Sequence, residues 1–393
     1  MSQTKVPLLD LTRLDPQVRA ELHDAFERVL ESGRYIMGPE VLSFEAECAE
    51  YVGAEEAIGV SSGSDALLAS LMALGIGPGD EVVCPTFTFF ATAGSVWRSG
   101  AKPVFVDSEP RSLCIDPRSI EACITENTKA IIPVHLFGQC ADMSQVLAVA
   151  QGHGIPVIED AAQAIGARHG DCCAGAMGIS GCFSFFPSKN LGCLGDGGLI
   201  TTNDQPLAER LRIVRDHGMK PKYHHDHVGG NFRLDALQAA FLRVKLRWLD
   251  RHVEMRRENA AAYDELFAQA GIVADQGDPN SEVVSAIDPG KIGLPVRTGK
   301  GHTYNQYVIR VPAGGRDELK AHLEAEGIAT EIYYPVPLHM QKAFKSIGHG
   351  EFPVAEKAAG EVLALPIFPE LTRKEIDHVA DQVVAWSVSK GHR

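Results

Sequence analysis

The sequence predicts an α/β protein: a large three-layer α/β/α domain with a mostly parallel sheet, followed by a smaller C-terminal α+β domain. Two observations predict this class. Short apolar runs alternate with segments of helical periodicity through the first two thirds of the 393 residues, and a long helical stretch then leads into a differently patterned remainder. We place the boundary at residue 250, so the expected domains are residues 1–250 and 251–393.

Six apolar runs have the length and composition of short strands that are buried on both faces, as strands of a parallel sheet must be. Segments with helical periodicity lie between them, for example residues 65–74 and 143–151. Ligands of such sheets gather at the carboxyl ends of the strands. The expected strands are residues 81–87, 102–107, 129–137, 155–160, 181–186 and 198–202.

One helical stretch, Ala236 to Ala270, is too long for a typical crossover helix and is expected to connect the two domains. The polar section from Asp275 to Gly301 contains Gly and Pro and predicts a loop or hairpin. The pattern of the remainder fits a small α+β domain. Its expected elements are strand-like residues 304–311 and 331–334, a helix at 316–327 and a final helix from Arg373 to about Val388.

Composition excludes several classes of function. A net charge of −14 argues against general affinity for nucleic acid or an anionic membrane. The chain starts without a basic and then apolar leader, and no apolar run approaches the ~18 residues of a membrane span, so we expect a cytoplasmic protein. Its nine cysteines are scattered without metal-ligand spacing, which predicts free thiols and no metal site.

Lys189, at the end of SFFPSK, follows Asp160, at the end of the apolar run IPVIED. Together they provide an amine that can hold an aldehyde as a Schiff base and a carboxylate that can keep a pyridine nitrogen protonated, the two groups that a pyridoxal 5′-phosphate (PLP) enzyme needs most. Burial can lower the pKa of such a lysine until its free amine acts as a base. Each residue alone is weak support, because both local patterns are common.

A third feature is the segment GVSSGSDALL, residues 59–68, in which small residues precede an apolar helix. The exposed N–H groups at that helix start could bind a phosphate. Taken alone, Ser64 or Asp65 would more simply be a helix cap.

These motifs, in this order, resemble the DegT/DnrJ/StrS sugar aminotransferases, which are PLP enzymes of the aspartate aminotransferase fold type. The resemblance extends from VPLLDL near the start to LPIFPEL near the end. It implies that residues 1–250 are the PLP-binding domain. The most specific markers are SGRYIMGPEV, VSSGSDAL, PTFTFFATA, PVHLFGQ, VIEDAAQAIGA, SFFPSKNLGCLGDGG, GGNFRLDALQAA and YYPVPLH.

The resemblance implies a role for each matching residue. Lys189 would form the internal aldimine and then move the proton between the substrate carbon and the C4′ carbon of the cofactor. Asp160 would pair with the pyridinium nitrogen, Gln163 would lie near the 3′-oxygen, and Phe89 would stack on the ring. The implied phosphate contacts are Gly63, Ser64 and Ser184, with Asn231 from the neighbouring subunit.

Asn231 therefore implies a homodimer with shared active sites, although Gly-Gly-Asn taken alone is typical of a turn. The family usually transfers an amino group from L-glutamate to a ketone on a nucleotide-linked sugar. A basic and aromatic stretch before Asn231 could contact the diphosphate, although alone it resembles a solvated loop. That stretch is Lys220, Lys222, Tyr223, His224 and His225, and the implied sugar pocket is Tyr304, Asn305, Gln306, Tyr333 and His339.

The forms SFFPSKNLGCLGDGG and HTYNQYVIR favour relatives that aminate C3 of a UDP- or dTDP-linked ketosugar, including 3-keto uronic acids. Amination at C4, or of a cyclitol, is the alternative within the family. A sugar 3-dehydratase would have histidine in place of Lys189. A non-enzymatic regulatory protein would have lost the lysine or the aspartate, or gained a DNA-binding segment. A Rossmann dehydrogenase would need a G-x-G-x-x-G motif that is absent from the sequence.

Overall fold

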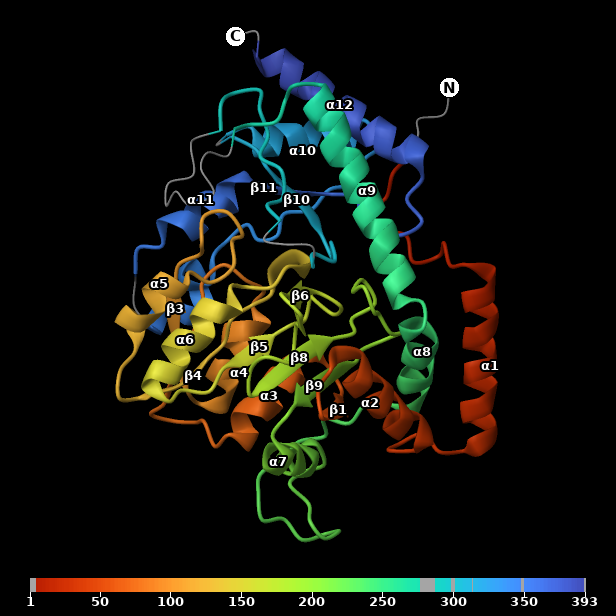
Figure 1. The fold of residues 1–393 in the computed structure, drawn as a ribbon, viewed down its shortest axis with the longest axis vertical. Coiled ribbons are helices and arrows are strands. Elements are labelled where there is room, and N and C mark those ends of the chain that lie inside the picture. Colours follow the sequence, from red (N-terminus) through yellow and green to blue (C-terminus); the bar gives the residue numbers. More distant parts are fainter. Residues whose placement is uncertain (1–4, 276–286, 298–300, 313, 348–349, 392–393) are drawn as a thin grey trace.

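The computed structural model describes residues 5–275, 287–297, 301–312, 314–347 and 350–391 (Figure 1). Most of the section from Asp275 to Gly301, expected to be a loop or hairpin, lies outside the described residues. Within the described ranges, none of the helices combines the length and the apolar character that crossing a membrane requires.

Two groups of short strands form the sheet of the N-terminal part. Parallel bridges from Ile131 to Val157 and from Val134 to Asp160 join the groups. β2 pairs in parallel with β3 and β4, and β5 with β8, whereas β9 runs antiparallel to both of its neighbours. In order, the strands are β1 (Glu56–Val60), β9 (Gly198–Thr202), β8 (Ser180–Ser184) and β5 (Ile158–Asp160) in one group, and β3 (Lys102–Val106), β2 (Glu81–Pro85) and β4 (Thr128–Ile131) in the other.

All six expected strands are present, and the mixed α/β class is confirmed. The run at residues 129–137 is a strand only as far as Ile131 and then forms the 3-10 turn η2 (Leu136–Gly138). The antiparallel direction of β9 was not expected, because an apolar run is buried on both faces in either direction. β1 was not predicted.

Helices cover both faces of this sheet. Several begin at a side-chain cap: Asp142 accepts from the Gln145 N–H, and Asp204 accepts from the Leu207 N–H. The helices are α1 (Pro16–Ser32), α2 (Pro39–Val52), α3 (Gly63–Ala73), α4 (Ala91–Ser99), α5 (Pro117–Ile120), α6 (Met143–His153), α7 (Gln205–Arg215) and α8 (Ala236–Leu246), with the short elements η1 (Glu121–Cys123), β6 (Arg168–His169) and β7 (Cys172–Cys173) between them.

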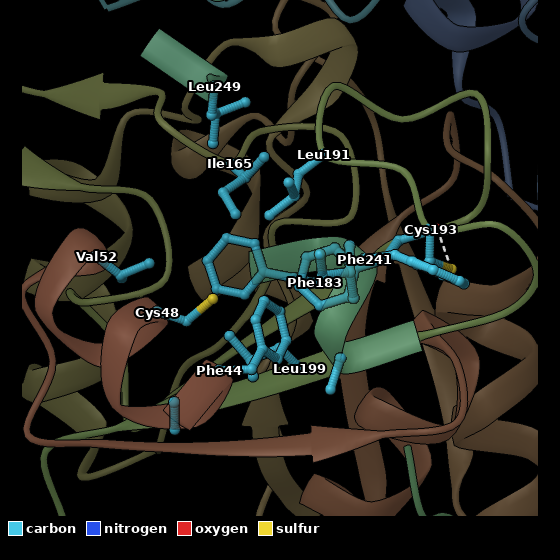
Figure 2. Packing of buried hydrophobic residues seen from close by; sticks show 14 of the residues in the cluster. Phe44, Cys48, Val52, Ile165, Phe183, Leu191, Cys193, Leu199, Phe241 and Leu249 are labelled. Carbon is cyan, nitrogen blue, oxygen red and sulfur yellow. Dashed lines mark hydrogen bonds between the residues drawn. The ribbon is translucent and has the colours of Figure 1, made fainter. Parts of the chain in front are cut away.

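Neighbouring residues of one strand pack into different hydrophobic clusters. Cys182 of β8 and Ile200 of β9 pack with residues of α3, α4 and α7. Phe183 and Leu199, next to them in sequence, pack with residues of α1, α2 and α8 (Figure 2). Successive side chains of a strand point to opposite faces, so different helices bury the two faces. The carboxyl ends of β5 and β8 emerge between these layers.

The expected single helix from Ala236 to Ala270 is wrong, because the chain forms α8 and then a second helix, α9 (Leu249–Gln269). The break is a tight turn in which the Trp248 N–H donates to the Lys245 carbonyl oxygen (3.1 Å). α8 packs on α1 and α2, whereas α9 packs on the C-terminal helix α12 (Arg373–Gly391). Both helices bury apolar residues, four of them consecutive in α8, so the apolar pattern continues across the change of direction.

The C-terminal elements enclose a separate hydrophobic cluster that includes Tyr263, Phe267 and Tyr307. The expected strand at residues 331–334 is wrong. Glu331 makes only one bridge, to Ala364 of an unpredicted strand. The remaining elements are β10 (Tyr307–Arg310), α10 (Arg316–Ala325), η3 (Leu338–Met340), η4 (Lys342–Ile347), α11 (Pro353–Glu361) and β11 (Val362–Leu365), with β10 and β11 antiparallel.

Glu45 joins α2 to the core. Its carboxylate accepts a hydrogen bond from the Gly59 N–H (2.7 Å) and pairs with the Arg215 guanidinium, and both charged groups are buried. Removing one partner of a buried pair leaves an uncompensated charge, so we expect Glu45→Leu to lower the free energy of unfolding by roughly 3–5 kcal/mol. Urea unfolding measures this. Glu50→Leu, at an exposed position of α2, should change it by less than about 0.5 kcal/mol; equal losses would contradict the prediction.

Candidate active site

Asp160 is the last residue of β5, and its carboxylate is buried. The Thr92 hydroxyl donates to Oδ2 (2.7 Å), and the Ala162 N–H donates to Oδ1 (3.2 Å). Burial raises the pKa of the Asp160 carboxyl, while these two hydrogen bonds and the Lys189 charge act in the opposite direction. A carboxylate in this position favours a cationic partner.

Lys189 lies on the turn that follows β8, where its N–H donates to the Phe186 carbonyl oxygen (2.8 Å). The turn is compact: a Cβ at Gly192 would lie 2.3 Å from the Pro187 carbonyl oxygen, so only glycine fits there. Desolvation lowers the pKa of the Lys189 amine to about 8, while the Asp160 carboxylate raises it. An appreciable fraction of the amine is therefore uncharged near neutral pH, as a base or nucleophile requires.

The first turn of α3 lies against the end of β8. A Cβ at Gly63 would come within 2.7 Å of the Ser184 Cβ. Ser62, not Ser64, caps the helix, because its hydroxyl accepts from the Asp65 N–H (3.1 Å). The structure thus brings Gly63 and Ser184 together at a helix N-terminus, where N–H groups and the helix dipole favour an anion.

Gln163 is held at both ends of its amide. Oε1 accepts from the Phe137 N–H (2.7 Å), and Nε2 donates to the Tyr334 hydroxyl (2.8 Å). The Tyr334 ring lies 6.2 Å from the Phe89 ring between centroids. The Phe89 side chain is 57% exposed and lines, together with Ser64, a pocket of about 360 Å³. Of the residues expected to contact the phosphate, Ser64 lines this pocket together with the expected stacking residue Phe89.

The segment containing Tyr304 and Asn305 packs on η2. A Cβ at Gly138 would lie 2.9 Å from the backbone nitrogens of both residues, and the Asn190 side-chain amide donates to the Thr303 carbonyl oxygen (2.9 Å). This segment is thereby connected to the residue that follows Lys189. Among the described residues, the buried Asn305 Oδ1 has no hydrogen-bond partner, so an acceptor remains for a ligand.

His339 is buried, and both of its ring nitrogens have protein partners. Nδ1 contacts the Thr86 hydroxyl (2.7 Å), and Nε2 contacts the Glu356 carboxylate (3.2 Å). In this arrangement the ring holds η3 against the end of β2 and has no nitrogen free for a substrate. Tyr333 is half-buried, with its ring 5.8 Å from that of Tyr334.

The loop between α7 and α8 protrudes beyond α7 (Figure 1). Lys222, Tyr223, His224 and Asn231 are all exposed there, Tyr223 by 77%. Among the described residues, no hydrogen bond or ion pair joins these four to Lys189 or Asp160 of the same chain.

Sequence reasoning missed three residues of the site: Thr92, Asn190 and Tyr334. Each lies within a quoted motif, beside or near a residue that was identified. Their proximity to a predicted site residue is the signal that could have identified them. Their contacts depend on distant parts of the chain and leave no local pattern.

These residues fit a planar anionic cofactor such as PLP. The α3 N-terminus and Ser184 would hold a phosphate, Asp160 a protonated ring nitrogen and Phe89 the ring face, and Lys189 would meet an aldehyde. With the mixed α/β fold, this arrangement is that of an aminotransferase.

The chain belongs to the DegT/DnrJ/EryC1/StrS aminotransferase family, whose model matches residues 16–384. This family is PLP-dependent. A protein of Geobacillus stearothermophilus named pleiotropic regulatory protein is 49% identical over 97% of this chain and 98% of its own. A UDP-N-acetyl-3-dehydro-α-D-glucosamine 3-aminotransferase of Acidithiobacillus ferrooxidans is 44% identical over 96% of each chain.

Solved structures agree with this assignment. DesV of S. venezuelae, in complex with a ketimine intermediate, has a TM-score of 0.89 and 43% identity, with 98% of both chains covered. NtdA from Bacillus subtilis, with the cofactor PMP bound, has a TM-score of 0.88 and 31% identity over 99% of this chain and 86% of that chain.

The substitution Gly63→Ala tests the proposed phosphate site at the N-terminus of α3 and Ser184, which we call the anion cradle. The alanine Cβ, 2.7 Å from the Ser184 Cβ, would push α3 and β8 apart. We expect Gly63→Ala to weaken PLP binding roughly tenfold or more, because phosphate hydrogen bonds are lost. Absorbance titration of the cofactor-free protein measures the affinity. Gly152→Ala, whose new Cβ would meet nothing within 4 Å apart from its chain neighbours and the backbone of its own helix, is the matched control. Unchanged affinity in Gly63→Ala would exclude the cradle.

Proposed function

We propose that the protein transfers an amino group from L-glutamate to the C3 ketone of a UDP- or dTDP-linked sugar, giving an aminosugar nucleotide for glycan or secondary-metabolite biosynthesis. The observation that carries the proposal is that the Lys189 amine and the buried Asp160 carboxylate are near enough for each charge to act on the pKa of the other, beside the α3 N-terminus. The name of the Acidithiobacillus relative supports a 3-ketosugar nucleotide as the substrate class.

Bound PLP supplies an electron sink for the charge that develops at the substrate carbon. The chain supplies the rest. Asp160, kept in place by Thr92, holds the proton on the ring nitrogen, and the water-poor surroundings strengthen that attraction. The Lys189 amine, with a pKa of about 8, would move a proton between the substrate carbon that is bonded to nitrogen and the C4′ carbon of the cofactor.

In the proposed arrangement, residues 1–250 form a three-layer cofactor domain and residues 251–393 a small α+β domain. The two differently covered sheet faces support the first, and the separate cluster around Tyr263 supports the second. The sugar would lie between them against Tyr304, Asn305 and Tyr333, with His339 acting from behind through Thr86.

The active form in this proposal is a homodimer in which Asn231 of one subunit completes the phosphate site of the other. Its exposure on a protruding loop supports this arrangement. Tyr35 and Ile36, between α1 and α2, and Leu42, on α2, are 45%, 54% and 61% exposed and form an apolar surface that a second copy would cover.

The loop between α7 and α8 is also a proposed contact for the diphosphate of the nucleotide sugar. Lys222 Nζ lies 5.1 Å from the centre of the Tyr223 ring, so a cation and an aromatic face are presented together. His224 beside them adds a further group that can donate hydrogen bonds to phosphate.

A regulatory role is the second candidate, and the name of the Geobacillus relative favours it. A protein that only regulates has no need of a lysine with a lowered pKa opposite a buried carboxylate. The intact pair therefore favours catalysis, and an activity assay separates the two roles.

The function test is direct. Purified protein with PLP, L-glutamate and one of three ketones, a 3-ketosugar nucleotide, a 4-ketosugar nucleotide or scyllo-inosose, is assayed for 2-oxoglutarate. We expect turnover with the 3-ketosugar and a loss of at least ~10²-fold in Lys189→Ala, because the base is removed. Lys374→Ala, at an exposed position of α12, serves as control. Preference for the 4-ketosugar or for scyllo-inosose would contradict the C3 assignment. Inactivity with all three would favour regulation.

Mixing two inactive variants tests the shared site. In a dimer of Lys189→Ala with Asn231→Ala, one site carries both substitutions, whereas the other has an intact lysine and an intact partner asparagine. We expect each variant alone to be impaired and the mixed dimer to recover activity at one of its two sites. Failure of the mixture to exceed the separate variants, once mass spectrometry confirms subunit exchange, would show that Asn231 acts in its own subunit or not at all.

A further inference from the structure

The turn that carries Lys189 continues as residues 190–197 and returns to β9. Cys193 fixes its centre: the Cys193 N–H donates to the Phe185 carbonyl oxygen (2.8 Å), and its sulfur lies 2.8 Å from the same oxygen. Figure 2 shows Cys193 at the edge of the cluster around Phe183. These contacts attach the turn to the end of β8 at Cys193 only. The residues on either side of Cys193 are held by other parts of the chain.

Two side chains of α8 hold those residues. Lys245 Nζ donates to the Gly192 carbonyl oxygen. About two helical turns earlier, Gln238 Oε1 accepts from the Leu194 N–H (2.8 Å). The helix thus contacts the turn once on each side of Cys193, through one acceptor and one donor of the turn's backbone.

Lys245 makes this contact with a charged amine that is partly removed from water. Its side chain is half-buried, and desolvation lowers the pKa of its amine, while Cys193 and the Glu370 carboxylate act in the opposite direction. Desolvating a cation costs free energy, which a hydrogen bond to a carbonyl oxygen offsets because charged donors make stronger bonds. The cation therefore has a strong preference for the Gly192 oxygen, and through it fixes the turn.

Gly192 links this contact to the reacting amine. A Cβ at Gly192 would lie 2.3 Å from the Pro187 carbonyl oxygen, so Gly192 is in direct contact with the residues just before Lys189. A displacement of Gly192 therefore moves the backbone on which Lys189 stands. The Asp160 carboxylate lies on a different element, at the end of β5.

We propose that Lys245 and Gln238 are positioning residues for the transamination, which hold the turn of residues 186–195 so that the Lys189 amine stays close to Asp160 and shielded from water. This inference rests on the proposed role of Lys189 as the reacting amine. Neither α8 side chain touches the reacting atoms; both act through the backbone of the turn.

The test reads the Lys189 amine in the cofactor-free protein. Acetic anhydride labelling across pH, followed by mass spectrometry of the Lys189 peptide, gives the midpoint of its titration, about 8 in the unaltered protein. In Lys245→Met the turn loosens and water reaches the amine. Desolvation is the main cause of the low value, so we expect the midpoint to rise toward the ordinary 10.5. In the PLP-loaded protein, kcat should fall roughly 10- to 100-fold with little change in KM.

Three further variants make the test decisive. Lys245→Arg keeps a cationic donor and should restore most of kcat and of the midpoint. Gln238→Leu should shift kcat and the titration midpoint in the same direction as Lys245→Met. If Lys245→Met does not fold, Gln238→Leu alone tests the proposal. Arg247→Met removes an exposed cation just after α8 that pairs with Glu21, and should change neither.

An unshifted midpoint in both Lys245→Met and Gln238→Leu would overturn the proposal. So would an equal shift in Arg247→Met, since that would indicate a general effect of charge or stability. The labelling measurement needs neither cofactor nor sugar. It therefore remains informative if the unaltered protein proves inactive on every ketosugar tested, and the two failures can be told apart.

Discussion

The placing of a buried carboxylate and a half-buried amine of opposite charge after two neighbouring parallel strands is the constraint around which this site is built. Asp160 ends β5, and Lys189 follows β8, its parallel partner. Each group is costly to bury alone, and each acts on the pKa of the other in the direction that favours the charged form. The arrangement is stable only while β5 and the turn after β8 keep their relative positions. The adjoining loops and helices hold them there.

Glu159, one residue before Asp160, shows how β5 is fixed. Its buried carboxylate accepts hydrogen bonds from three backbone N–H groups, with distances of 2.6 to 2.8 Å, and contacts His135 Nε2 (2.8 Å). Successive residues of a strand point to opposite faces, so one carboxylate of the Glu-Asp pair anchors surrounding loops while the other enters the site. The donors are the N–H groups of Gly175, Met177 and Gly178.

Around this pair the site is assembled from segments far apart in sequence. Gln163 joins η2 to Tyr334, and Asn190 joins the lysine turn to the segment at Thr303. Each link uses a side-chain amide that donates or accepts at a backbone or hydroxyl group. Such bonds have a defined geometry, so they position the segments more exactly than apolar packing alone would.

Local signals in the sequence were sufficient for the six expected strands of the N-terminal part and for selecting Lys189 and Asp160 as candidates, because each depends on the period of apolar residues or on the chemistry of one side chain. The tertiary structure alone decided the break at Trp248, the antiparallel direction of β9 and the pairing of β11. It also decided that His339 bonds to Thr86 and that α8 holds the lysine turn. These features depend on which distant surfaces meet, and the apolar pattern of a segment shows that it is buried without showing against what.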